Sequence, residues 1–248
     1  MVVTDLFDEP SMWRIEAAQQ LGLSDRELVA VMSPGPGFPA TLRSLESALP
    51  ASPRVIVDLG AGCGGVSEWL RASTEAVVYA VEPAAGARRV AHLAFPLLRV
   101  VEGTAERVPL PGGVADAVTI SGVLSLMSDI DAVIDEVDRL LTTSGRVAIT
   151  DLFSSDAVTF CSSPNVFRSV EDLTRTLRRH RFSAASVACG DPTPEPAWAA
   201  AADAVDEWIT ANCADRPGYE EWSQDRRHLR RHIDRGDVIG GCVVAERT

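Results

Sequence analysis

Residues 55–66 read VIVDLGAGCGGV, and this stretch decides the fold. Its β-branched run, 55–57, lies between Pro53 and a loop with four glycines, a pattern typical of a buried parallel strand. Residues 66–70, which read VSEWL, predict a helix directly after the loop. A strand, a glycine-rich loop and a helix in this order bring free backbone N–H groups and open space to one point. The stretch therefore predicts a ligand site at the carboxyl end of the strand.

Two classes of cofactor bind to loops of this kind. Gly60, Gly62 and Gly65 fit G-x-G-x-x-G, the dinucleotide fingerprint. Asp58 argues against a dinucleotide, because its carboxylate at the strand end would repel a diphosphate. S-adenosylmethionine (SAM) carries a cationic sulfonium and ammonium and no phosphate, so an acidic strand end suits it. A glycine-rich turn without a ligand is the remaining alternative.

The pattern Asp58-x-Gly60-x-Gly62-x-Gly64 resembles the first motif of class I SAM-dependent methyltransferases, and the resemblance extends over about residues 50–190. It implies an α/β fold with a seven-stranded, mainly parallel, doubly wound sheet whose last strand is antiparallel. It also implies methyl transfer from SAM to an O, N or C atom of a small molecule, with S-adenosylhomocysteine (SAH) as product. A catalytically silent SAM-binding partner protein and an NAD-dependent oxidoreductase are the alternatives.

Further cofactor residues are expected at the ends of the neighbouring strands. Glu82 ends a strand predicted at 76–82. It follows Gly60 by the number of residues at which an acidic side chain accepts hydrogen bonds from ribose hydroxyls. The resemblance places residues 104–106 beside the adenine, with Thr104 where the family usually has Asp, and the end of the strand 115–121 beside the methionine part. The predicted cofactor site therefore comprises Asp58, Gly60, Ala61, Gly62, Gly64, Glu82, Thr104, Ala105, Glu106, Ser121 and Gly122.

Four parts of the chain are predicted around this site. Residues 1–50 form an N-terminal helical cap, 51–192 the SAM-binding core, 193–235 a helical lid insertion and 236–248 the final core strand. Local signals predict the other elements. Helices are expected at 11–21, 24–32, 40–49, 84–95, 129–141, 169–180, 197–212 and 219–235, and strands at 97–101, 146–152, 182–189 and 238–246.

The residues that contact the acceptor carry weaker signals. Asp151 ends a predicted strand at the ligand-binding edge, and His228 shares a helix face with His232, so Asp151 and His228 are the predicted catalytic residues. The alternative for Asp151 is a helix or loop cap, and the arginines beside the histidines are expected to form a solvated face. No metal site is predicted, because the histidine pair lacks a third ligand. Four aromatic residues are expected to line the acceptor pocket or, alternatively, to pack the core: Trp13, Phe38, Trp198 and Trp222.

Composition narrows the function classes. The 248 residues carry a formal net charge of −12, which argues against a nucleic-acid partner. All 23 basic residues are Arg, which excludes lysine Schiff-base chemistry and, with the many Ala and Val residues, suggests a bacterial source. Five scattered Cys predict reduced thiols in a cytoplasmic protein. Neither a signal peptide nor a membrane span is expected. The oligomeric state is not predicted.

Overall fold

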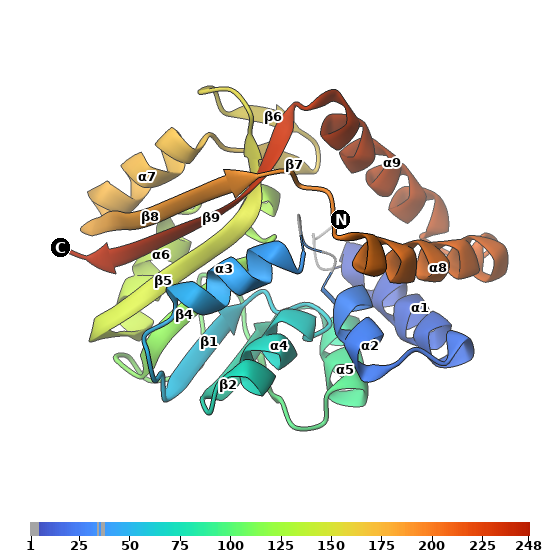
Figure 1. Cartoon of the computed structure of the whole chain (residues 1–248), viewed down its shortest axis with the longest axis horizontal. Coiled ribbons are helices and arrows are strands. Elements are labelled where there is room, and N and C mark those ends of the chain that lie inside the picture. Colours follow the sequence, from blue (N-terminus) through green and yellow to red (C-terminus); the bar gives the residue numbers. More distant parts are fainter. Residues whose placement is uncertain (1–4, 34, 36–37) are drawn as a thin grey trace.

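Seven strands form one sheet in the order β3-β2-β1-β4-β5-β9-β8 (Figure 1). The computed structural model describes residues 5–33, 35 and 38–248. The strand β9 runs antiparallel to both β5 and β8, whereas the other pairs are parallel, so the predicted seven-stranded sheet with an antiparallel last strand is confirmed. The strands are β1 (Val55–Leu59), β2 (Val77–Glu82), β3 (Arg99–Glu102), β4 (Ala115–Ser121), β5 (Leu141–Ser154), β8 (Phe182–Gly190) and β9 (Val238–Arg247).

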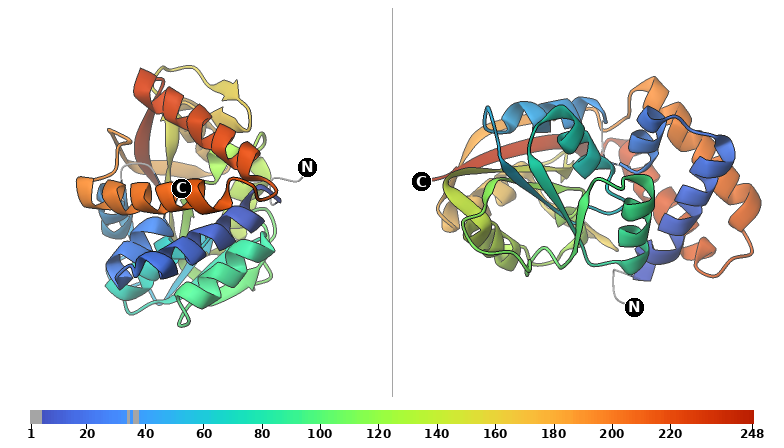
Figure 2. Two further views of the ribbon diagram at one scale, coloured as in Figure 1. Left: turned by 90° about the vertical axis from the view of Figure 1, so that its right-hand side faces the viewer. Right: turned by 90° about the horizontal axis from the view of Figure 1, so that it is seen from below.

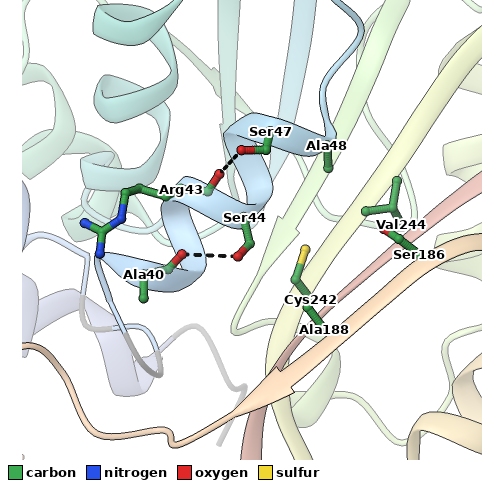
Figure 3. Close-up of a pocket in the computed structure, with 9 residues that line it drawn as sticks. All are labelled: Ala40, Arg43, Ser44, Ser47, Ala48, Ser186, Ala188, Cys242 and Val244. Carbon is green, nitrogen blue, oxygen red and sulfur yellow. Dashed lines mark hydrogen bonds between the residues drawn. The ribbon is translucent and has the colours of Figure 1, made fainter.

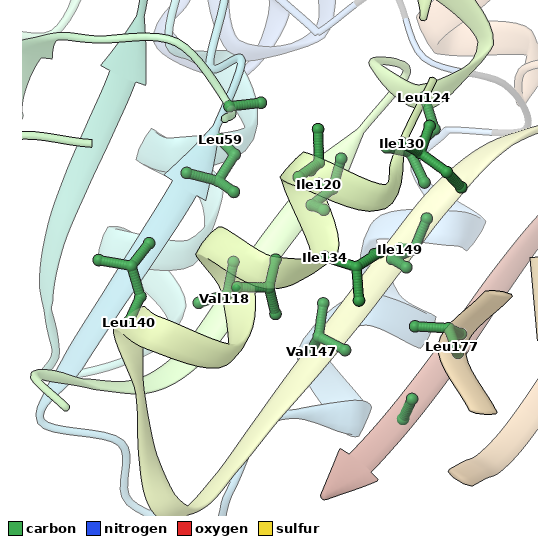
Figure 4. Packing of buried hydrophobic residues seen from close by; sticks show 14 of the residues in the cluster. Leu59, Val118, Ile120, Leu124, Ile130, Ile134, Leu140, Val147, Ile149 and Leu177 are labelled. Atoms are coloured by element: carbon green, nitrogen blue, oxygen red, sulfur yellow. The ribbon is translucent and has the colours of Figure 1, made fainter. Parts of the chain in front are cut away.

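Helices cover both faces of this sheet. On one face, α6 (Asp131–Leu140) and α7 (Val170–Arg179) pack on the strands around Ile120, Ile134 and Ile149 (Figure 4). On the other face, α3 (Ala40–Ala48) packs on β5 and β9 and α4 (Gly65–Ser73) packs on β2, and both helices bury leucines there. Burial of these aliphatic side chains on both faces explains why the central strands read as continuous apolar runs.

A further group of helices lies beyond the sheet. Helix α1 (Asp5–Leu21) packs against α5 (Ala85–Ala94), α8 (Pro196–Cys213) and α9 (Tyr219–Arg235), and Figure 2 shows α1, α8 and α9 together at one end of the molecule. The helix α2 (Asp25–Val31) joins α1 to the loop before α3. The two helices between β8 and β9 form the predicted helical insertion.

The helix predicted at 24–32 begins with a capping box. The Ser24 hydroxyl accepts a hydrogen bond from the Glu27 N–H at 3.4 Å, and the Glu27 carboxylate accepts one from the Ser24 N–H at 2.9 Å. The first helix, in contrast, begins at Asp5 and not near Ser11, so Ser11 lies inside it. Packing of α1 against other helices outweighs the helix-breaking tendency of Pro10, which lies inside α1.

Two features of the strands differ from the prediction. Strand β5 begins at Leu141 and not at Arg146, because Leu141 already pairs with Ala115 on β4 and a bulge accommodates the residues before Arg146. A two-stranded hairpin, β6 (Phe160–Ser162) and β7 (Asn165–Phe167), follows β5 where no strand was predicted. Strands of three residues give no periodic pattern, so sequence reasoning had no signal for this hairpin.

Candidate active site

The ends of three neighbouring strands bring the predicted cofactor residues together. Strands β2, β1 and β4 are parallel neighbours, so Glu82, Asp58 and Ser121 all reach the carboxyl edge of the sheet. The glycine loop that connects β1 to α4 lies at the same edge. Ligands of doubly wound folds bind at this edge, where the strand order reverses beside the first strand.

Asp58 lies behind the loop with both carboxylate oxygens occupied. Its side chain is buried and accepts hydrogen bonds from the hydroxyls of Ser67 at 2.6 Å and Thr119 at 2.7 Å. Burial raises the Asp58 pKa to about 6, with a smaller contribution from the neighbouring Glu82, although the two hydroxyls act in the opposite direction. Asp58 therefore links β1 to α4 and β4, and it influences the cofactor region through its charge.

Glu82 links the second strand to the glycine loop. Its two carboxylate oxygens accept hydrogen bonds from the backbone N–H groups of Gly62 and Ala84, each at 2.8 Å. Burial raises the Glu82 pKa, and these two hydrogen bonds oppose the shift. A carboxylate has about four lone-pair sites, so Glu82 can still accept hydrogen bonds from two ribose hydroxyls.

The glycines of the loop differ in the space beside them. Gly60 has φ +68° and lies against Val123, so a Cβ at Gly60 would collide with that side chain. Gly62 and Gly122 also have positive φ values, +55° and +68°, but a Cβ on either would meet no atom within 4 Å. The first glycine is therefore required by packing, and the other two border open space that a ligand can fill.

Comparisons with known proteins agree with this geometry. Residues 57–149 match a family model described as a methyltransferase domain. The matched segment extends from β1, through the glycine loop, into β5. The open space at Gly62 and the free lone pairs of Glu82 fit the nucleoside part of SAM, the predicted cofactor.

Solved structures share the fold of this chain at low sequence identity. A geranyl diphosphate C-methyltransferase from Streptomyces coelicolor A3(2) has 14% identity and a TM-score of 0.63, covering 84% of this chain and 77% of its own. A SAM-dependent methyltransferase from Geobacter sulfurreducens has 18% identity and a TM-score of 0.63, with coverages of 88% and 93%. The [4+2]-cyclase SpnF has 18% identity and a TM-score of 0.68, with coverages of 84% and 80%. A search of curated proteins finds no match.

The remaining predicted cofactor residues lie around the same edge. Ala61 donates its N–H to the Val81 carbonyl, and Gly64, with φ +84°, is the N-cap of α4. Thr104 forms a tight turn with Arg107 and is exposed, whereas Ala105 is buried and Glu106 is exposed. The adenine contacts of residues 104–106, and the contacts of Ser121 and Gly122 with the methionine part, stay predictions.

Asp151, the first of the two predicted catalytic residues, is held by backbone hydrogen bonds at the end of β5. Asp151 is buried, and it accepts hydrogen bonds from the backbone N–H groups of Ser125 at 3.0 Å and Leu152 at 2.8 Å. Burial raises the Asp151 pKa, and Arg168 opposes the shift. Asp151 thus holds the short helix η1 (Leu124–Leu126) against the end of β5. A direct role in catalysis stays a prediction.

His228 belongs to a polar network between α9 and the hairpin. The Nε2 atoms of His228 and His232 each lie 2.8 Å from the Ser162 hydroxyl, and His232 Nδ1 lies 2.8 Å from the Asp237 carboxylate. Among the described residues no group of three or more His, Cys, Asp or Glu side chains is placed to hold a metal ion.

The four aromatic candidates form two ring clusters. Trp13 packs against Trp222 with ring centroids 6.2 Å apart, and Phe38 packs against Trp198 at 6.3 Å. Trp13, Phe38 and Trp198 are almost fully buried. All four side chains therefore contribute to the packing of the helices, and their contact with an acceptor stays a prediction.

Two hollows lie elsewhere on the molecule. One, of about 460 Å³, lies between α3 and the strands β8 and β9 (Figure 3) and is lined by Ala40, Arg43, Ser44, Ser47, Ala48, Ser186, Ala188, Cys242 and Val244. Burial raises the Cys242 pKa to about 11, so this thiol stays protonated. A second hollow, of about 590 Å³, lies beside α9 and includes His228. Neither is lined by a predicted cofactor residue.

Sequence reasoning missed several residues that shape the site. Ser67 and Thr119 hold Asp58, but a serine in a helix and a threonine in a strand carry no distinguishing pattern. Arg14 and Ser33, both buried, lie near the glycine loop. The available signal for Arg14 was its position on the apolar face of a helix, because a charged side chain is rarely buried without a partner. No helix in the described parts of the chain is both long and apolar enough to cross a membrane.

Proposed function

We propose that this chain transfers the methyl group of SAM to an O, N or C atom of a small molecule and releases SAH. The observation that carries the proposal is the position of Glu82 and the open Gly62 beside each other within the methyltransferase domain. SAM supplies a methyl group already activated by the sulfonium. The protein then has to bind and orient both molecules and exclude water.

The small-molecule acceptor is supported by charge and by the similar structures. A net charge of −12 disfavours a nucleic acid as acceptor. Similar solved structures are named for geranyl diphosphate and for sarcosine dimethylglycine methylation. We propose that α8 and α9, which pack on α1 at the carboxyl end of the sheet, act as the lid over the acceptor.

The setting of the reaction is also a proposal. The lysine-free composition supports a bacterial source and, with it, a role in specialised metabolism. Five free cysteines support a reducing, cytoplasmic environment. Asp151 and His228 remain the proposed catalytic residues, and acid–base help is needed only for an acceptor that must lose a proton.

Parallel calorimetric titrations with SAH, SAM and NAD test the cofactor. We expect micromolar binding of SAH and SAM and no binding of NAD. Binding of NAD alone would overturn the proposal. The next measurement is SAH production with a panel of small-molecule acceptors. Binding of SAM without SAH production from any acceptor would favour a silent partner protein.

A further inference from the structure

Arg14 is a buried cation without a protein anion beside it. Its side chain, on α1, is 8% exposed, and its Nη1 donates to the Val31 carbonyl at 3.1 Å. No carboxylate of the described residues forms an ion pair with it. Arg226, a half-buried arginine on α9, does have a carboxylate partner, Asp206, and lies over the Trp222 ring. A guanidinium has five N–H donors, so most of those on Arg14 remain available to an anion.

Ser33 supplies a second polar group without a partner. Its side chain is 4% exposed, and its hydroxyl has no hydrogen-bond partner. The hydroxyl lies against the first residue of α4, because a Cβ on Gly65 would collide with it. Ser33 follows Val31, the residue to which Arg14 donates, by two positions. A buried hydroxyl without a partner is rare in folded proteins and indicates a missing ligand group.

Both groups lie beside the glycine loop. On α1, one turn before Arg14, the Ser11 side chain is hydrogen-bonded to Cys63 in that loop, and Arg14 interacts electrostatically with the same thiol. Cys63 does not provide the missing anion, because burial raises the pKa of its thiol. Helix α1, the end of α2 and the glycine loop therefore enclose a cationic position that no described side chain neutralises.

We propose that Arg14, assisted by the Ser33 hydroxyl, binds the α-carboxylate of the methionine part of SAM. The inference rests on the proposed function, since it requires SAM as the ligand. SAM has one anionic group, and a buried arginine with free donors is its natural partner. The two nearby carboxylates, Asp58 and Glu82, cannot bind it. An anionic group of the acceptor is the competing source of the same chemistry.

Two ligands that differ in the amino-acid end measure the contribution of the carboxylate contact separately from the rest of cofactor binding. SAH carries the amino-acid end, whereas 5′-methylthioadenosine lacks it but keeps the adenosine. Calorimetry of the Arg14→Gln protein should show roughly 10- to 100-fold weaker SAH binding, as expected for the loss of charged hydrogen bonds. Its affinity for 5′-methylthioadenosine should be unchanged. Ser33→Ala should give a smaller loss for SAH alone, and Arg14→Lys should recover part of the affinity.

An exposed arginine provides the matched control. Arg89→Gln, on the outer face of α5, should bind both ligands like the unmodified protein. Unchanged SAH affinity in Arg14→Gln would refute the inference, and so would an equal loss for both ligands with an intact melting temperature. A raised KM for the acceptor with unchanged SAH affinity would assign the anion to the acceptor. Failure of the unmodified protein to bind SAH would instead refute the proposed function, and the inference with it.

Discussion

Replacing Asp58 by Asn should remove a specific pH dependence of stability. Asp58 is buried behind the glycine loop, and the hydroxyls of Ser67 and Thr119 occupy its oxygens. An Asn side chain has nearly the same shape, and either hydroxyl can rotate to accept from the amide, so the network can survive without the charge. The substitution therefore isolates the effect of ionising a buried carboxyl.

The size of the effect follows from the pKa difference. The Asp58 pKa is about 6 in the fold and 3.8 when the group is exposed. The fold thus holds the proton more tightly than the unfolded chain does. The stabilisation is fully present below pH 3.8 and is lost as the pH rises through 6. A difference of about 2.2 pKa units is worth about 3 kcal/mol, of which about 2 kcal/mol should be lost between pH 4.5 and 7.5.

Urea unfolding followed by tryptophan fluorescence measures this directly. Urea titrations of the unmodified protein and of Asp58→Asn are run at several pH values between 4.5 and 7.5, and equal m-values check two-state behaviour. The free energy of unfolding of the unmodified protein, relative to Asp58→Asn, should fall by about 2 kcal/mol across this range. A difference that is independent of pH would show that Asp58 is ionised throughout, and the reasoning would fail. Ser67→Ala, which removes a hydrogen bond that lowers the pKa, should move the fall to higher pH.

Three further predictions concern the rest of the chain. Glu82→Gln should weaken SAH binding by roughly 10- to 100-fold in calorimetry, since an amide cannot replace a charged acceptor, whereas the exposed Glu102→Gln should not; equal affinities would remove Glu82 from the site. Gly62→Ala should lower the free energy of unfolding by about 1 to 2 kcal/mol and should weaken SAH binding by more than that. Gly60→Ala should mainly lower the melting temperature, because the added Cβ would collide with Val123. The reverse order of these effects would contradict the open space at Gly62. The carboxylates of Asp131 and Asp135 raise the pKa of His180, so this residue should stabilise the fold below pH 6.5 and lose the effect as the pH rises through its folded pKa. Unfolding of the unmodified protein and of His180→Gln at pH 6 and pH 9 measures this. The same difference in unfolding free energy between the two proteins at both pH values would disprove the pairing.

The sequence was sufficient for the sheet, because its signals are local. The run at 55–57, the glycines after it and Glu82 predicted the strand–loop–helix unit and its partner strand, and β1 and β2 pair as expected. The helices predicted at 24–32 and 169–180 begin at serines, and Ser24 and Ser169 each accept a backbone hydrogen bond at the start of α2 and α7. Such contacts join residues three apart and leave a trace in the sequence.

The details of the site were not predictable, because they depend on residues far apart in the chain. The partner of Asp58 on β4 is 61 positions away, and the Ser162 hydroxyl meets His228 across 66 positions. The hairpin that carries Ser162 is formed by two strands of three residues, too short for a periodic pattern. Sequence reasoning placed His228 and His232 on one helix face, but only the fold shows that both point to a serine.

The structure changes the argument that selects the cofactor. The preference of Asp58 for SAM over a dinucleotide was expected to come from direct charge contact. Both of its oxygens are instead bound to hydroxyls, so its preference acts through the electrostatic field in a region shielded from water, where charges interact strongly. Glu82 adds a second buried carboxylate at the same edge, and Arg14 lies beside Cys63 in the loop. The buried negative charge of Asp58 and the positive charge of Arg14 are opposite in sign to the cationic groups and the carboxylate of the methionine part of SAM, and Glu82 suits its ribose hydroxyls. This correspondence is a stronger reason for the cofactor than the glycine pattern, which dinucleotide-binding proteins share.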